Sequence, residues 1–273
     1  MPAAALQAFV ERHRRLFVLT GAGCSTGSGI ADYRDAQGHW KRPPPVTYQA
    51  FVADHGVRQR YWARSLIGWP RFAAARPNAV HHALAALEQQ GRIALLLTQN
   101  VDGLHQQAGS AQVIDLHGRL DRVVCLACGQ GLARAQLQQQ LLAANPGWER
   151  LTAASAPDGD ADLDGVDFSR FVVPACAHCG GVLKPDVVFY GQNVPRSRVE
   201  AVHAHLQRSD AVLVLGSSLM VWSGLRFVQA AVRAGLPVAA VNLGVTRADD
   251  LLELKIDAEC GQALAFVASA QPA

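Results

Sequence analysis

The chain has 273 residues, half of them hydrophobic, so it can bury one large core together with a smaller domain. Its formal net charge of +3 is too small to predict a nucleic-acid or membrane surface, and no apolar run approaches the ~20 residues of a bilayer span. Residues 1–15 have the pattern of a short amphipathic helix, without the apolar core or cleavage site of a signal peptide. We therefore expect a cytoplasmic protein, in which cysteines stay reduced and bind metal more readily than they pair.

The first predicted strand, residues 17–19, runs into a glycine-rich turn. Gly21 and Gly23 lack the Cβ atoms that would keep a phosphate away from the backbone, and the Ser- and Thr-rich residues after them can open an anion-binding helix. A dinucleotide fingerprint would have a third glycine where Thr26 stands, and an acidic residue after a second strand, which is missing. A strand-to-helix turn that simply needs small residues is therefore an alternative at this point.

The middle of the chain alternates between helical and strand patterns. Residues 41–76 are rich in aromatic residues and bounded by prolines, which predicts an insertion of short helices. Residues 78–90 have helical spacing and end at a glycine. Residues 93–98 form a continuous apolar run, typical of a strand buried on both faces in a parallel sheet. A short helix and a further strand, residues 113–116, then lead to His117.

Two more apolar strands follow near the C-terminus, over residues 211–215 and 237–241, with a helix between them. Strands that alternate with helices predict an α/β fold with a Rossmann-like parallel sheet, whose carboxyl ends line one crevice. Small and polar residues follow the strands: Gln99, Asn100, Val101 and Asp102; Gly216, Ser217 and Ser218; Asn242, Leu243 and Gly244. This repetition makes a dinucleotide site at the crevice the favoured interpretation of the glycine-rich turn.

Two CxxC pairs lie in the intervening segment. They are Cys125 with Cys128, and Cys176 with Cys179. Two thiolates from each pair complete the tetrahedral four-cysteine set of a closed, structural zinc site, which leaves no open position for catalysis. A redox dithiol would normally have a single CxxC, and His178, inside the second pair, is a competing ligand. The acidic stretch 160–165 begins like a calcium loop, but Phe171 stands where a bidentate Glu is required, so a solvated loop is expected.

The chain contains a series of motifs in a fixed order: the glycine-rich turn, residues 99–102, Leu116-His117-Gly118, the paired CxxC motifs, residues 216–218 and residues 242–244. With these motifs in this order, the chain resembles the sirtuins, a family of NAD-dependent protein-lysine deacylases. The resemblance runs from about Phe17 to Cys260, and residues 61–64, 68–70, 156–160 and 183–189 are most similar to the class II branch. It implies NAD and one structural Zn²⁺ as cofactors, and acyl-lysine proteins or peptides as substrates.

The resemblance also implies a division of the chain and a set of NAD-binding residues. Residues 1–40, 77–120 and 183–273 would form the Rossmann-like NAD-binding domain, residues 41–76 the helical insertion and residues 121–182 the zinc domain. The residues expected at the NAD site are Gly21, Ala22, Gly23, Asp32, Tyr33, Arg34, Trp40, Gln99, Asn100, Val101, Asp102, Gly216, Ser217, Ser218, Asn242, Leu243, Gly244 and Cys260. Ala31, Gly27 and Gln192 depart from residues that are usual in the family.

His117 is the residue that the resemblance assigns to catalysis. The acyl oxygen would attack the ribose carbon as nicotinamide leaves, and a base that titrates near neutrality would then deprotonate a ribose hydroxyl. Val187 and Phe189 would line the acyl-lysine tunnel. Tyr61 and Arg64 share one helix face and fit a pair that binds a distal acyl carboxylate, so we expect longer or acidic acyl groups to be better substrates than acetyl.

Three other functions are compatible with parts of this pattern. Protein mono-ADP-ribosylation also releases nicotinamide, and the sequence does not separate it from deacylation. A nicotinamide-dependent dehydrogenase would reduce NAD reversibly instead of cleaving it. A zinc-ribbon module on nucleic acid is disfavoured by the low net charge and the lack of a basic stripe.

Overall fold

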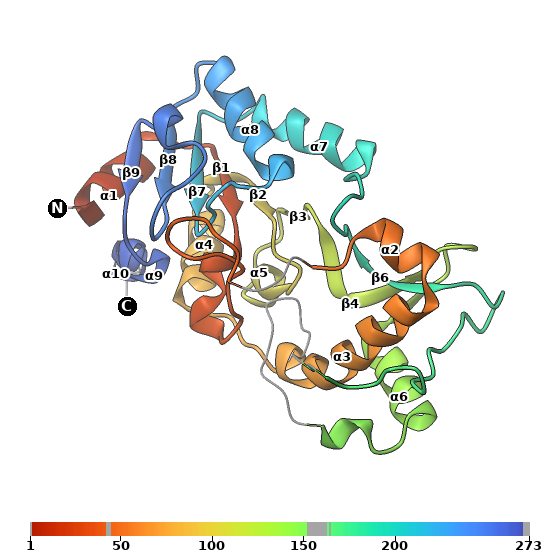
Figure 1. The fold of residues 1–273 in the computed structure, drawn as a ribbon. Helices are drawn as coiled ribbons and strands as arrows, with labels where there is room; N and C mark the ends of the chain where they lie inside the picture. Colours follow the sequence, from red (N-terminus) through yellow and green to blue (C-terminus); the bar gives the residue numbers. More distant parts are fainter. Residues whose placement is uncertain (1, 42–44, 152–162, 164, 270–273) are drawn as a thin grey trace. The chain divides into compact units, whose positions relative to one another are not determined.

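The computed structural model describes residues 2–41, 45–151, 163 and 165–269. It divides the chain into two compact units, each described here by itself (Figure 1). The first unit contains Met1–Arg42, Arg76–Leu116 and Val194–Ala273, and the second contains Pro43–Ala75 and His117–Asn193. The stretch that resembles a calcium loop lies mostly outside the described residues. No described helix combines the length and the apolarity that a bilayer span requires.

The first unit is built on a parallel six-stranded sheet in the order β3-β2-β1-β7-β8-β9. Its strands are β1 (Leu16–Thr20), β2 (Ile93–Thr98), β3 (Val113–Asp115), β7 (Ala211–Leu215), β8 (Val238–Val241) and β9 (Leu254–Ile256). Numbered along the chain within this sheet, the order is 3-2-1-4-5-6, which is the order of the Rossmann fold. Strands β1 and β7 are buried along their whole length, as the continuous apolar runs predict.

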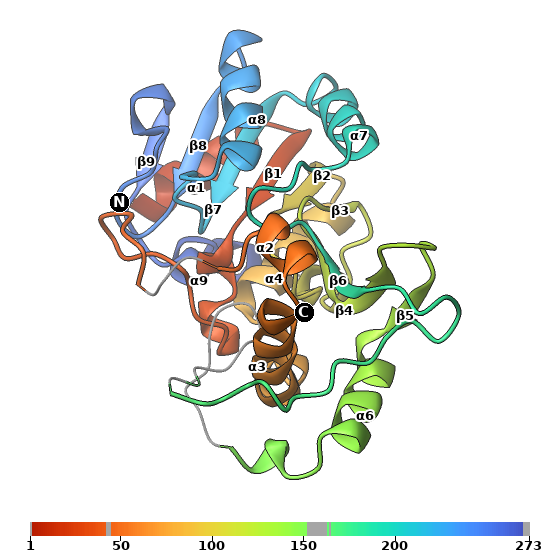
Figure 2. The same cartoon turned by 45° about the vertical axis from the view of Figure 1, so that its right-hand side comes forward.

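Helices cover both faces of this sheet. They are α1 (Pro2–Arg12), α4 (Ala79–Gln89), α5 (Leu104–Gln107), α7 (Arg196–Leu206), α8 (Trp222–Arg233), α9 (Cys260–Ala263) and α10 (Ala265–Ser269). On one face Leu6 and Leu84 pack with Val18 and its neighbours, and on the other Phe227 packs against Phe17. Helices α7 and α8 lie next to each other on the second face (Figure 2). Because successive strand residues point to opposite faces, strands β1, β2, β3, β7 and β8 contribute to both cores, whereas β9 contributes Leu254 and Ile256 to the first only.

The second unit combines a small antiparallel sheet with three helices. The sheet has the order β5-β4-β6, with β4 (Gly118–Cys125), β5 (Gly131–Ala133) and β6 (Leu183–Val187). The helices are α2 (Tyr48–Ala53), α3 (His55–Ala73) and α6 (Arg134–Ala144). One core joins Phe51 and Trp62 of the helices to Val123 and Leu183 of the sheet. The structure therefore groups residues 43–75, 117–120 and 183–193 with the cysteine-containing segment. The division expected from the sequence has 117–120 and 183–193 in the larger domain instead, and 41–76 as a separate insertion.

Two local structures differ from the expected ones. The glycine-rich turn continues into two 3₁₀ turns, η1 (Ala22–Cys24) and η2 (Thr26–Ser28), and not into an α-helix. The aromatic insertion contains α3, a helix of 19 residues with Pro70 inside it. A proline cannot donate to the carbonyl four residues earlier, which is Leu66 here. The Nε2 group of Gln138 donates to that carbonyl at 2.8 Å, so the helix tolerates the proline. A third 3₁₀ turn, η3 (Trp148–Arg150), and a fourth, η4 (Asp249–Leu251), complete the described elements.

Candidate functional site

The four cysteines of the CxxC pairs form a metal-binding cluster in the second unit. Their sulfur atoms all lie within 4.8 Å of one another, with 3.5 Å between Cys125 and Cys179 and 3.8 Å between Cys128 and Cys176. Zinc bound tetrahedrally at ~2.3 Å places its sulfur ligands ~3.8 Å apart, so this donor set fits Zn²⁺. His178 is outside the cluster found among the described residues.

The backbone around the cysteines favours this arrangement. The N–H of Gly129 donates to Cys125 and that of Gly180 to Cys176, which closes the turn of each CxxC pair. A Cβ on Gly181 would lie 2.9 Å from the sulfur of Cys125, so a larger residue there would crowd the ligands. A hydrogen bond from the backbone N–H of Cys128, above all, lowers the pKa of Cys125 to about 6, while the pKa of Cys179 is raised to about 12. The backbone therefore favours the thiolate form of Cys125, the form that binds metal.

In the first unit, the glycine-rich turn after β1 packs directly on the loop after β7. The N–H of Gly21 donates to Leu215 at 3.0 Å, and the N–H of Gly23 donates to Gly216 at 2.8 Å. A Cβ on Gly21 would lie 2.7 Å from the Gly216 carbonyl oxygen, and one on Gly216 would lie 2.5 Å from the Cys24 nitrogen. The glycines are therefore required for contact between the two loops. This reason differs from the one predicted from the sequence, which was the approach of a phosphate to the backbone. Strands β1 and β7 flank the point where the strand order reverses, which is where open α/β sheets bind ligands.

Polar side chains of the residues that follow β2 join this turn. The Ser25 hydroxyl donates to Asp102 at 2.7 Å, and the Nδ2 group of Asn100 donates to the Ser25 oxygen and to the Gly21 carbonyl, each at 3.0 Å. The Ser217 hydroxyl donates to the side chain of Gln99 at 2.6 Å. The structure thus brings together the predicted residues that follow β1, β2 and β7. Ser25, almost fully buried at the centre of this network, was not among the predicted site residues.

Residues 32–41 form a closed loop. Arg34 and Trp40 make an antiparallel bridge, and the Arg34 guanidinium lies 3.9 Å from the Trp40 ring centroid. Lys41 and Asp32 form an ion pair at 2.5 Å. The N–H of Val245 donates to Ala36 at 2.9 Å, which attaches this loop to the segment after β8. Asp32, Tyr33, Arg34 and Trp40, all predicted for the NAD site, therefore lie in one hairpin.

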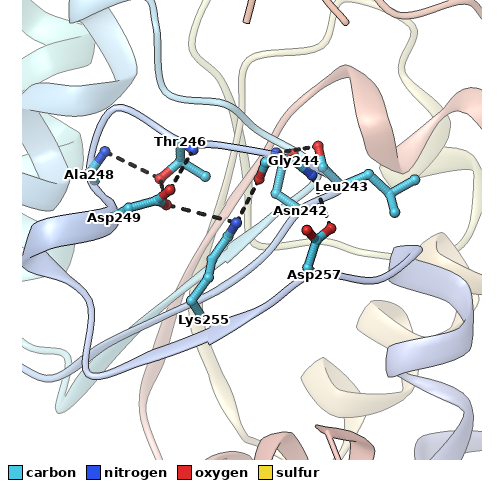
Figure 3. A network of polar contacts seen from close by, with 8 residues as sticks. All are labelled: Asn242, Leu243, Gly244, Thr246, Ala248, Asp249, Lys255 and Asp257. Carbon is cyan, nitrogen blue, oxygen red and sulfur yellow. Dashed lines mark hydrogen bonds and ion pairs between the residues drawn. The ribbon is translucent and has the colours of Figure 1, made fainter. Parts of the chain in front are cut away.

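The segment after β8 is supported by β9 (Figure 3). The ammonium of Lys255 donates to Gly244 at 2.6 Å and lies 3.8 Å from Asp249, while the N–H of Gly244 donates to Asp257 at 3.0 Å. The Nδ2 group of Asn242 donates to Leu243 at 2.9 Å. Lys255 and Asp257 were missed in the sequence analysis. Their signal was weak, a single charged residue in a short apolar run and an acidic residue after it.

Two pairs of buried side chains surround the glycine-rich turn. A hydrogen bond with Cys260 and burial raise the pKa of the Cys24 thiol well above its usual value, so Cys24 is a thiol at neutral pH. His81 and His105 have ring centroids 4.7 Å apart, and His105 shares a 2.9 Å hydrogen bond with Thr20 at the end of β1. Burial lowers the pKa of His81 to about 4 and that of His105 to about 3, so both are neutral near pH 7.

His117 is the first residue of the second segment of the second unit, and it lies two positions after the end of β3. Its carbonyl accepts a hydrogen bond from the N–H of Val188 at 2.7 Å. Gly118, with a φ of +84°, allows β4 to approach β6, since a Cβ there would lie 2.0 Å from the Asp186 carbonyl oxygen. Leu116, the residue before His117, belongs to the first unit and donates its N–H to Thr98 at the end of β2. The backbone of His117 is thus hydrogen-bonded to Val188, the residue that follows β6.

Two of the predicted acyl-binding residues, Tyr61 and Phe189, pack in one aromatic cluster of the second unit. The Tyr61 ring centroid lies 5.4 Å from that of Phe189 and 5.3 Å from that of Phe51. Arg64 lies three residues after Tyr61 on α3 and is half-buried. Val187 ends β6 and is also half-buried. Phe51 was not predicted as part of this cluster.

Together, the fold and these sites define a class of protein: a doubly wound α/β dinucleotide-type unit, joined in one chain to a unit that holds a four-cysteine metal centre. Comparison with known proteins is consistent with this class and identifies its family. Residues 21–223 match the profile described as the Sir2 family, and the chain belongs to that family, the sirtuins.

Individual relatives cover most of the chain. The chain is 71% identical over 263 residues to "NAD-dependent protein deacetylase" of Xanthomonas campestris pv. campestris (strain 8004), with 96% of this chain and 90% of that protein covered. It is 46% identical to "NAD-dependent protein lipoamidase sirtuin-4, mitochondrial" of Bos taurus, with 96% and 84% covered. A solved structure described as "Sir2-p53 peptide-NAD+" has a TM-score of 0.80 at 29% identity and covers 98% of both chains.

Proposed function

We propose that this sirtuin removes acyl groups from lysine side chains of proteins or peptides and consumes NAD, releasing nicotinamide and O-acyl-ADP-ribose. The observation that carries the proposal is the polar network at the reversal point of the sheet, in which Ser25 connects Asn100, Asp102 and the glycine-rich turn. Relatives with 71% and 62% identity are named NAD-dependent protein deacetylases. We also propose the cytoplasm as the location of the protein.

The residues of the first unit fit NAD because they offer fixed hydrogen-bonding groups along the carboxyl ends of four strands. When bound, NAD would supply the ribose carbon that the acyl oxygen attacks, with nicotinamide as the leaving group, and the ribose hydroxyl that finally carries the acyl group. Asn100 and Asp102 would bind at the nicotinamide end, with Asp102 held in orientation by Ser25 and by the N–H of Leu104 at 2.9 Å. Ser217 and Asn242 would bind the phosphates and ribose of the adenosine half.

His117 would act as the general base that removes a proton from the ribose hydroxyl. An imidazole suits this step because it exchanges a proton near neutral pH. General-base assistance typically contributes ~10²–10⁴ in rate. We therefore expect His117→Ala to lose turnover by about that factor while the affinity for NAD stays within a few-fold of wild type.

The test is mass spectrometry of acyl-lysine peptides incubated with NAD and with wild type or His117→Ala. Free lysine peptide together with O-acyl-ADP-ribose supports deacylation. ADP-ribose attached to protein, without loss of the acyl group, would instead identify a mono-ADP-ribosyltransferase. Turnover at the wild-type rate in the variant would remove His117 from the mechanism.

Acyl groups longer than acetyl, or with a terminal carboxylate, are the proposed preferred substrates. Tyr61 and Arg64 support this proposal because they share a face of α3 and Tyr61 packs against Phe189, and a relative at 46% identity is named a lipoamidase. Arg64→Met should weaken turnover of acidic acyl-lysine peptides selectively. Arg60→Met, which alters an exposed arginine of the same helix, is the matched control. An equal loss on acetyl-lysine in Arg64→Met would contradict this role.

A further inference from the structure

Lys184 is a buried lysine that the proposed chemistry does not use. It is the second residue of β6, where it pairs with Val124 of β4, and only 3% of it is exposed. Its ammonium donates to the carbonyl oxygen of Pro185 at 2.8 Å and to that of Val187. It also lies 4.7 Å from the centroid of the Phe189 ring, within the range of a cation–π interaction.

A charged side chain in this position is costly for the fold. Burial lowers the pKa of Lys184 to about 8, and nearby Asp186 opposes this decrease. At neutral pH the amine therefore keeps its proton and its three N–H donors. A methionine of similar length would fill the same space without the cost of desolvating a charge. The carbonyl oxygens and the aromatic face that offset this cost all belong to residues 185–189.

These contacts connect Lys184 to the backbone of His117. Val187, whose carbonyl accepts from the ammonium, is followed by Val188, whose N–H donates to the His117 carbonyl at 2.7 Å. Phe189 comes next, and its ring packs against Tyr61. One ammonium group therefore stabilises the conformation of a five-residue segment that bonds to His117 and carries Phe189.

We propose that Lys184 is a positioning residue for deacylation, whose ammonium holds the carbonyls of Pro185 and Val187 so that Val188 orients His117 and Phe189 keeps its place in the aromatic cluster. This inference rests on the proposed roles of His117 and Phe189. A misplacement of reacting groups by about 1 Å costs roughly 100-fold in rate. The loss should fall mainly on the step that needs His117, with a smaller effect on the use of the acyl-lysine peptide, and not on NAD.

The experiment compares the full-length wild type with Lys184→Met, which keeps the length of the side chain and removes the charge. The matched control is Arg122→Met, which removes a positive charge from an exposed side chain of the same sheet. For each protein we would measure the melting temperature, kcat and KM for an acyl-lysine peptide and for NAD, and exchange of labelled nicotinamide into NAD. Exchange reports cleavage of the nicotinamide bond, which precedes the step assigned to His117.

Lys184→Met should lower kcat/KM for the peptide roughly 10- to 100-fold, with KM for NAD within about twofold and exchange reduced far less than deacylation. Arg122→Met should behave like wild type.

A Lys184→Met protein with unchanged kcat/KM, or with exchange and deacylation reduced equally, would overturn the inference. If this variant does not fold, Lys184→Gln, which keeps an N–H donor, is measured by the same criteria. Wild-type turnover in His117→Ala would overturn the role of His117 on which this inference rests, and a wild-type protein that forms no free lysine peptide with NAD would overturn the proposed function itself. Inactive His117→Ala beside fully active Lys184→Met would overturn only the role of Lys184.

Discussion

Replacement of Gly216 by alanine tests the close contact between the loops after β1 and β7. Gly216 has a φ of +58°, and a Cβ there would lie 2.5 Å from the Cys24 nitrogen and 2.6 Å from the Gly23 carbonyl carbon. Both neighbours are backbone atoms, so they cannot move aside by rotating a side chain. The substitution therefore forces one loop away from the other, and both loops carry predicted NAD-binding residues.

The expected loss of stability has two parts. A left-handed backbone conformation costs an L-residue ~1–2 kcal/mol, and overpacking of a close contact typically costs ~1–3 kcal/mol. Their sum is about 2–5 kcal/mol. Gly235→Ala is the matched control, since Gly235 has a φ of +74° but nothing within 4 Å of the position of a Cβ. The control should lose only the first part, about 1–2 kcal/mol.

Thermal unfolding and NAD titration would separate these parts. At ~2–4 °C per kcal/mol for a chain of this size, the ~1–3 kcal/mol of overpacking should make Gly216→Ala melt roughly 2–12 °C below Gly235→Ala. Measured below both melting temperatures, its affinity for NAD should also fall, while that of the control should not. Equal melting temperatures and equal affinities for the two variants would refute the argument from loop contact.

Three further predictions address the metal centre, the buried histidines and the segment after β8. Cys176→Ser should abolish stoichiometric zinc binding, measured by atomic absorption, and should destabilise the second unit by several kcal/mol, since structural zinc contributes directly to folding; retention of both zinc and stability would contradict the four-cysteine assignment. Burial lowers the pKa of His81 to about 4 and that of His105 to about 3, so below about pH 6.5 the unfolded chain binds protons that the folded chain does not. The free energy of unfolding should therefore be highest above about pH 6.5 and should fall as the pH decreases toward 4. His105→Asn should flatten this dependence. An unchanged pH profile of unfolding in that variant would argue against a neutral buried His105. Lys255→Met, which removes the donor to Gly244, should raise KM for NAD roughly 3- to 10-fold at nearly constant kcat, and a loss confined to kcat would place Lys255 elsewhere in the mechanism.

Much of the architecture could be predicted because its signals are local. Strands β1, β2, β7 and β8 are continuous apolar runs, which only a sheet covered on both faces can bury. The spacing of Cys125 with Cys128 and of Cys176 with Cys179 similarly encodes a metal site within short stretches of chain. The sirtuin resemblance, confirmed by the family match over residues 21–223, rests on such local motifs in a particular order.

Other features were missed because they depend on distant partners. Strand β9 has three residues, and its pairing with β8 could not be inferred from a pattern so short. Helix α3 passes through Pro70 because Gln138, far along the chain, donates to the carbonyl that the proline leaves without its helical partner. The aromatic insertion shares a core with the small sheet, since Phe51 and Trp62 are buried against residues more than fifty positions away.

The sequence by itself therefore determined the parallel sheet, the four zinc ligands and the family of this protein, because periodicity and ligand spacing act over a few residues. Only the tertiary structure decided why Gly21 and Gly216 must be glycines, and that Ser25, Lys184 and Lys255 support residues predicted to bind NAD and substrate. Hydrogen bonds and steric contacts between residues remote in sequence exist only once the chain has folded, and no local pattern records them.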